Sequence, residues 1–196
     1  MQSKGIVFAA IVFTVATGCS KEASTPVQAR ADDDGAGFVS VKVDGEDNNR
    51  KIAMRDNCDP ADPAWAPTGG CLLKRGDVTN AEFGALLRSP LSPTLIGHPS
   101  WRMEPAHASI ESGKSLRVSN SGGRVHTFTE VANFGGGRVP PLNVGLTPAP
   151  ECASAINVPA GGSLEIPSMS NGLHKFECCI HPWMRATVRV TSRTRS

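Results

Sequence analysis

The stretch that decides the fold lies near the C-terminus and reads Phe176-Glu177-Cys178-Cys179-Ile180-His181-Pro182-Trp183-Met184. It carries a thiol, an imidazole and a thioether in the pattern Cys178-x-x-His181-x-x-Met184. A second imidazole, His126, lies 52 residues before Cys178, after the run Asn120-Ser-Gly-Gly-Arg-Val. Sulfur and imidazole donors suit transition metals, so the joint pattern indicates a metal site rather than four unrelated core residues.

Two His nitrogens, one Cys sulfur and a weak axial Met form the ligand set of a blue, type 1 copper site. The pattern resembles the cupredoxin family, and the loop from Cys178 to Met184 is similar to the short ligand loop of amicyanin-like members. The resemblance implies an all-β Greek-key sandwich holding one copper ion through His126, Cys178, His181 and Met184. It also implies a one-electron carrier between redox proteins that is not an enzyme, has no small-molecule substrate, and passes electrons out through His181.

The resemblance requires Cys178 as the sulfur ligand, because it needs the spacing Cys-x-x-His. Neighbouring residues of a strand point to opposite faces, so Cys179 points away from the metal. Cys152 is then the unassigned thiol, and we expect a Cys152–Cys179 disulfide that fastens the long loop behind the ligand loop.

Three residues beside the ligands are expected to support them. Thr127 stands where the family often has Asn after the first His ligand, and its hydroxyl can still link the ligand loops. Pro182 and Trp183 flank His181 and are expected to form an apolar collar around it. Apolar residues before and after the motif alternate with a period of two, as in sandwich strands: Leu116, Val118, Phe128, Phe176, Ala186, Val188 and Val190.

The first residues predict export from the cytoplasm. Residues 1–18 have a basic start at Lys4 and a short apolar core, which is typical of a secretory signal. The run Ala16-Thr-Gly-Cys19 looks like a bacterial lipobox, which predicts a lipid anchor on Cys19 and a place in the periplasm or at the cell surface. Ordinary signal-peptidase cleavage nearby is the alternative. Residues 19–36 are polar and are interpreted as a flexible linker.

Residues 37–94 are interpreted as an N-terminal extension of unassigned role, preceding a copper domain at 95–196. Thr79-Asn-Ala-Glu82 matches a capping box and predicts a short helix to about Leu87, while alternating valines at 39–43 predict a strand. We expect Cys58 and Cys71 to form a disulfide in an exported protein. A metal loop using Asp59 and Asp62 is the alternative.

Other functional classes fit the chain less well. The net charge is +2, and the sequence has 20 Gly and 15 Pro but no dense basic block, which gives no support for nucleic-acid binding. The sequence has no His-x-His pair for a multicopper oxidase and no C-x-x-C-H haem motif. A cysteine hydrolase using Cys178 and His126 leaves Met184 unexplained, and zinc is feasible but binds less tightly than copper. A copper-binding or copper-delivery lipoprotein without electron transfer remains the alternative function.

Overall fold

The computed structural model describes residues 50–88, 100–143 and 145–192. They belong to a single unit that spans residues 44–196. The predicted signal peptide, Cys19, the linker and the strand at 39–43 lie outside the described residues. Among the residues that are described, no helix has the length and apolar character needed to cross a membrane.

Eight of the strands form two sheets. The first sheet has the order β2-β1-β4-β8 and consists of β1 (Lys51–Asp56), β2 (Trp101–Glu104), β4 (Leu116–Asn120) and β8 (Ser163–Ile166). The second has the order β3-β10-β9-β6 and consists of β3 (His107–Glu111), β6 (Thr129–Val131), β9 (Gly172–Glu177) and β10 (Arg185–Thr191). Each sheet mixes antiparallel neighbours with a parallel pair, β1 with β4 and β3 with β10.

One apolar core lies between the sheets. Alternate residues of both sheets point into it, as a period of two requires. The first sheet contributes Ile52, Met54, Trp101, Met103, Leu116 and Val118, and the second contributes Ala108, Ile110, Phe176, Ala186, Val188 and Val190. The predicted all-β sandwich is therefore confirmed, and its helices are few and short.

The alternation of buried and exposed residues ends in β10 close to the ligand loop. In β10, residues 185–188 are all buried, and only from residue 189 does exposure alternate. The outer face is covered at Arg185, which donates to the Gly135 carbonyl at 2.9 Å and lies over the Phe134 ring, and at Thr187, which is hydrogen-bonded to His107; Phe134 and Gly135 belong to the segment from 132 to 160. This segment contains η3 (Pro140–Leu142), η4 (Pro150–Ser154) and β7 (Asn157–Val158), which pairs with β5 (His126–Thr127). It is a long connection with short helical turns, not a bare loop.

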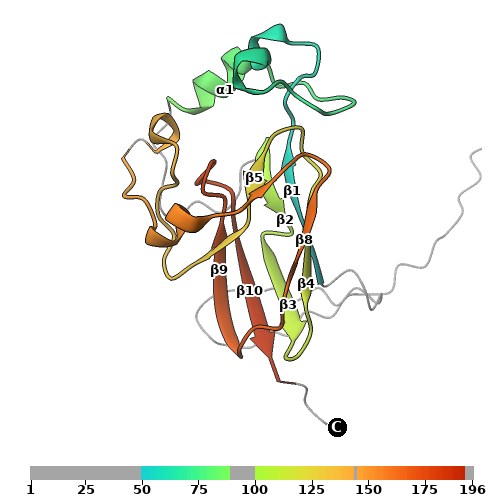
Figure 1. Ribbon diagram of the computed structural model, residues 1–196, viewed down its shortest axis with the longest axis vertical. Coiled ribbons are helices and arrows are strands. Elements are labelled where there is room, and N and C mark those ends of the chain that lie inside the picture. The colour runs from blue at the N-terminus through green and yellow to red at the C-terminus, as the bar shows by residue number, and fades with distance from the viewer. Residues whose placement is uncertain (1–49, 89–99, 144, 193–196) are drawn as a thin grey trace, which may run out of the picture. The chain divides into compact units, whose positions relative to one another are not determined.

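The predicted short helix is α1 (Asn80–Leu86). Thr79 caps it: its hydroxyl accepts a hydrogen bond from the Glu82 backbone N–H, and the Glu82 carboxylate accepts one from the Thr79 N–H. Before it, η2 (Pro63–Thr68) lies within the loop closed by the Cys58–Cys71 disulfide. Figure 1 shows α1 and this loop at one end of the two sheets, the end at which β5 also lies.

The boundary expected at residue 94 needs correction. β1 lies inside the first sheet, where it pairs in parallel with β4 and antiparallel with β2. Ile52 and Met54 are buried in the core of the sandwich. Residues 51–56 are therefore an integral strand of the sandwich, and the residues after them are an insertion at its end rather than a separate extension.

Candidate metal centre

The four candidate ligands are held by three strand ends. His126 begins β5, Cys178 follows the last residue of β9, and Met184 immediately precedes β10. The turn between β9 and β10 is closed by two backbone hydrogen bonds of 2.9 Å, from the Cys178 N–H to the Met184 carbonyl and from the Met184 N–H to the His181 carbonyl. The tight spacing Cys-x-x-His-x-x-Met is what allows one turn to present three of the side chains together.

The loop before His126 is fixed by Asn120. Its side-chain N–H groups donate to the carbonyls of Arg124 at 2.7 Å and Val158 at 2.9 Å, and its side-chain oxygen accepts from the Gly122 N–H at 2.9 Å. The Asn-x5-His spacing thus has a structural reason: the amide holds the turn that leads into the ligand.

Three donor atoms converge on one point. His126 Nδ1 lies 3.1 Å from His181 Nδ1, and the Cys178 Sγ lies 3.8 Å and 3.6 Å from these two nitrogens. A single metal ion at about 2.0 Å from each nitrogen and about 2.3 Å from the sulfur could therefore bind all three donors together. The donors therefore fit a trigonal His2Cys site, the kind to which a long axial Met is added in type 1 copper centres.

The donors are withdrawn from water. His126, Cys178 and Met184 are 0% exposed and His181 is 5% exposed. Met184 packs in the same core cluster as Cys178 and Trp183. Met184 is therefore a buried residue of the core at the end of the turn that carries Cys178 and His181.

Electrostatics favour a thiolate beside an imidazolium when no metal is bound. Burial by itself raises the pKa of the Cys178 thiol, but hydrogen bonds and charge from His126 and His181 outweigh it and hold this pKa well below its usual range. Burial lowers the pKa of His126, yet its hydrogen bonds to Asp56 and Cys178 raise it to about 9. The pKa of His181 is lowered, mainly by burial. These pKa shifts favour a proton on His126 rather than on Cys178 when no metal is bound.

Asp56, at the end of β1, is a site residue that sequence reasoning missed. Its Oδ2 lies 2.7 Å from His126 Nε2, and both side chains are completely buried. The sequence contains a signal for this role. Asp56 continues the two-residue spacing of Ile52 and Met54, so its carboxylate is expected on the inward face of the strand. The expected boundary at residue 94 places Asp56 outside the copper domain, so the sequence pattern alone does not connect it with His126.

Thr127 links the two ligand segments. Its backbone N–H donates to the Cys178 sulfur at 3.3 Å, and its hydroxyl accepts from the Cys179 N–H at 2.7 Å. The hydroxyl therefore does what the resemblance expects of an Asn here, tying the segment of His126 to that of Cys178.

His181 does not lie flush with the surface. Besides Trp183, whose ring centroid is 5.6 Å away, the rings of Phe83 at 6.2 Å and Trp101 at 6.4 Å surround it. Pro182 is buried, and its carbonyl accepts a hydrogen bond from Arg185 Nε. The expected collar of Pro182 and Trp183 thus corresponds to a larger aromatic cover. The imidazole borders a mainly apolar cavity of about 470 Å³, which Phe83, Trp65 and Leu142 also line.

Both expected disulfides are present, Cys58–Cys71 and Cys152–Cys179, and Cys178 is the free cysteine of the described residues. Cys179 belongs to a small second cluster with Cys152 and Val131, on the other side of the strand from Cys178. Asp59 and Asp62 serve as turn caps, accepting from the N–H groups of Ala61 and Ala64. The metal loop considered for these two aspartates therefore has a simpler structural explanation.

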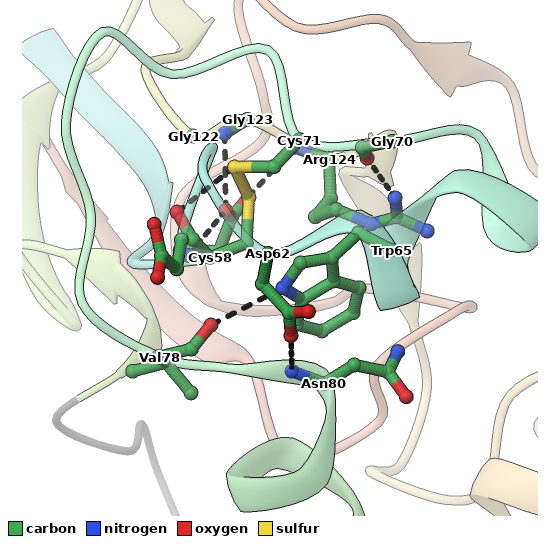
Figure 2. The surroundings of a disulfide bond; sticks show 12 residues. Cys58, Asp62, Trp65, Gly70, Cys71, Val78, Asn80, Gly122, Gly123 and Arg124 are labelled. Carbon is green, nitrogen blue, oxygen red and sulfur yellow. Dashed lines mark hydrogen bonds between the residues drawn. A yellow bond between two sulfur atoms is a disulfide. The ribbon is translucent and has the colours of Figure 1, made fainter.

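Figure 2 shows how the Cys58–Cys71 disulfide anchors the inserted loop beside the turn that precedes His126. The Asp62 carboxylate also accepts from the Asn80 N–H at 2.7 Å, and the Trp65 indole donates to the Val78 carbonyl at 3.2 Å. Arg124 stacks over Trp65 and donates to the Gly70 carbonyl. These contacts connect the loop, α1 and the turn at 122–124 into one cap at the ligand end of the sandwich.

Comparison with known proteins gives fold-level likenesses. No family model and no curated protein matches the chain. Among solved structures, a purple cupredoxin from Nitrosopumilus maritimus is similar over 72% of this chain and 98% of its own, with 15% identity and a TM-score of 0.37. A reduced amicyanin mutant is similar over 45% of this chain and 71% of its own, with 18% identity and a TM-score of 0.32. A mutant fern plastocyanin is similar over 47% of this chain and 90% of its own, with 14% identity and a TM-score of 0.34. At these scores the likenesses carry no weight by themselves, and the sandwich and donor set stand on the sheet pairing and distances given above.

Proposed function

We propose that this chain is a mononuclear type 1 copper protein that carries single electrons between redox proteins, with His126, Cys178, His181 and Met184 as ligands. The observation that carries the proposal is the convergence of two imidazole nitrogens and one thiol sulfur, 3.1 to 3.8 Å apart, in a buried pocket. Copper bound there supplies the change between its two oxidation states. The chain supplies the ligands and has no catalytic role in this proposal.

The surrounding structure suits repeated electron transfer. The donors sit at the ends of paired strands, and the turn that holds three of them is closed by backbone hydrogen bonds. Thr127 keeps the two ligand segments in register, and burial keeps water from the donors. A site that cannot rearrange limits the reorganisation that accompanies a change of charge. His181 is the most exposed of the four ligands, so the electron is proposed to leave through its ring edge and the adjoining cavity.

Copper delivery is the alternative function, and burial argues against it. A delivery protein must release its metal to a recipient, whose ligands need access to the ion. Here His126, Cys178 and Met184 are fully buried and aromatic rings surround His181. This arrangement favours a resident metal.

Export and lipid anchoring through Cys19 are part of the same proposal. Support comes from the signal-like residues 1–18 and from two disulfides in a small domain, which are typical of oxidising compartments. Mass spectrometry of the membrane fraction of expressing cells tests it, with Cys19→Ala as the control. An acylated Cys19 at the mature N-terminus is expected, and an unmodified start elsewhere contradicts the anchor.

The visible and EPR spectra of the protein with added Cu(II) test the metal site, with Cys178→Ser as the comparison. We expect an intense thiolate-to-copper band that bleaches reversibly with a reductant and is absent from Cys178→Ser. A weak spectrum of tetragonal copper in the wild-type protein would contradict the electron-carrier function. A blue site that loses copper readily to a chelator without cycling would favour delivery.

A further inference from the structure

The buried carboxylate of Asp56 has every acceptor position occupied. Its Oδ1 accepts from the Gly123 N–H at 3.0 Å and the Cys58 N–H at 3.4 Å. Its Oδ2 accepts from the Arg124 N–H at 3.0 Å and faces His126 Nε2 at 2.7 Å. Each of the three backbone groups can only donate. Three N–H donors on two oxygens favour the carboxylate form, so Asp56 is held as an acceptor.

The identity of the donor in the Asp56–His126 pair follows from this arrangement. An ionised carboxylate can only accept, so Nε2 of His126 must carry a proton. The other ring nitrogen, Nδ1, is the one that lies 3.1 Å from His181 Nδ1 and 3.8 Å from the Cys178 sulfur. With the Nε2 proton held by Asp56, the lone pair of Nδ1 is left for a metal, and the ring plane is fixed by the bond behind it.

The position of Asp56 is itself held by the cap. It ends β1, two residues before the Cys58–Cys71 disulfide. A Cβ on Gly122 would collide with the Asp56 carboxylate, and one on Gly123 would lie 2.7 Å from both disulfide sulfurs. Figure 2 shows this disulfide against the Gly122–Gly123 turn. The two glycines therefore let the turn close over the carboxylate, and the disulfide backs the turn.

We propose that Asp56 is a positioning residue for the metal site: it fixes the tautomer and ring orientation of His126 and sets a permanent negative charge behind that ligand. This rests on the proposed copper site. A negative charge close to the ligand stabilises the more highly charged ion, so Asp56 favours Cu(II) over Cu(I) and lowers the reduction potential. The cap that follows β1 would thereby influence the metal through His126.

The first test uses the wild-type protein loaded with Cu(I), which is diamagnetic, and nitrogen-15 NMR of its histidine rings. We expect His126 to carry its proton on Nε2, with a proton resonance far to low field and slow exchange with water, because the bond to Asp56 is short and buried. A rapidly exchanging proton at an ordinary shift would overturn the proposal. This readout needs no redox activity, so it decides the inference even if the protein forms no blue centre and the electron-carrier function fails.

The second test compares Asp56→Asn with Glu177→Gln. An Asn side chain has one acceptor oxygen, so it cannot serve both the backbone N–H groups and His126. Glu177 is an equally buried carboxylate next to Cys178, but its Oε2 accepts from the Gly135 N–H at 2.9 Å and it does not contact a ligand imidazole. Burial raises its pKa to about 7, so the comparison is made well above that pH, where both carboxylates are ionised.

For Asp56→Asn we expect Cu(II) affinity to fall by about 10- to 100-fold, as for other residues that orient metal-bound His. We expect the ratio of Cu(II) to Cu(I) affinity to fall about tenfold, which raises the potential by about 59 mV, and the slow-exchanging Nε2 proton to be lost. Glu177→Gln should keep that proton and shift the potential less. Equal shifts of the reduction potential in the two variants would mean that Asp56 acts only through its charge, and this would overturn its positioning role. If Asp56→Asn does not fold, the wild-type NMR measurement remains decisive.

Discussion

The ligand loop at 176–184 and the segment at 51–88 meet at the same end of the sandwich but differ in how much of their role can be read from their residues. The loop carries its donors within a few residues, in an order that restricts the chemistry to a soft-metal site. The segment contains a carboxylate, a disulfide and a short helix, each of which is common in proteins. Only their placement around His126 and His181 makes them part of the centre.

This difference teaches that a metal site has an outer shell that depends on tertiary structure. Asp56 and His126 are 70 residues apart, and Phe83 of α1 reaches His181 from the same distant segment as Asp56. Local spacing holds no information about such pairs. Local spacing in a sequence can therefore predict the metal ligands, whereas the residues that orient and cover those ligands lie in a distant segment and cannot be predicted in this way.

The largest expected effect comes from removing the disulfide that anchors the cap. The double variant Cys58→Ser/Cys71→Ser should lose roughly 3 kcal/mol of unfolding free energy, because the closed loop no longer restricts the unfolded chain. The loss can be measured by denaturant unfolding of the metal-free protein. We also expect a broader Cu(II) EPR spectrum, since the turn over Asp56 loses its support.

The matched control is Cys152→Ser/Cys179→Ser, which opens the other disulfide and leaves the cap intact. Its loss of stability should be similar. A cap variant whose EPR spectrum is identical to that of the wild type would show that the cap and the metal site are independent.

The number of protons released on metal binding tests the Asp56–His126 pair directly, because the proton is expected to come from His126. In the metal-free protein the pKa of Cys178 is lowered and that of His181 is lowered, whereas that of His126 is raised to about 9. At pH 7 Cu(I) binding should therefore release about one proton, from His126 Nδ1. Cu(I) affinity should rise by about a factor of ten for each pH unit and level off above about 9.

Titration of the protein with Cu(I) in weakly buffered solution measures this release. We expect little of the release to come from Cys178, because His126 and His181 hold the pKa of its thiol well below the usual range. Release of two protons at pH 7 would mean that Cys178 is a neutral thiol. Release of none would mean that Asp56 does not hold His126 in its charged form.

The sequence allowed the sandwich, the convergence of His126, Cys178 and His181, and both cysteine pairings to be predicted, for identifiable physical reasons. Alternation in β4 reflects one buried face, and the Thr79–Glu82 pair caps α1 by a local hydrogen-bond pattern. The aromatic cover could not be predicted, because Phe83 and Trp101 become neighbours of His181 only after distant segments pack. The valine strand predicted at 39–43 lies outside the described residues, and it stays a prediction.

Phe83→Ala tests whether the segment at 51–88 protects the metal. The Phe83 ring is 4.7 Å from Trp101 and 6.0 Å from Trp183, between centroids, so its loss opens the cover over His181. Because Phe83 is only partly buried, we expect a loss of about 2 kcal/mol, below the range for a fully buried Phe. Copper should pass to a chelator several-fold faster. Leu72→Ala is the control, since Leu72 belongs to the same segment, 51–88, and is 73% exposed. Equal rates in the two variants would remove any protective role from Phe83.

Thr127→Val, with Thr127→Ser as its control, should have the smallest effect, and it probes the ligand segments without touching the cap. Valine has nearly the same shape as threonine but offers no acceptor, so the buried Cys179 N–H that Thr127 now satisfies at 2.7 Å would lose its partner. This should cost about 1 to 2 kcal/mol, measured by denaturant unfolding, and the serine variant should recover most of it. The Thr127 N–H that donates to the Cys178 sulfur belongs to the backbone and survives both changes. The thiolate-to-copper band should therefore stay near its wild-type position in both variants, whereas a large shift in Thr127→Val alone would show that the hydroxyl, and not only the backbone, positions the thiolate.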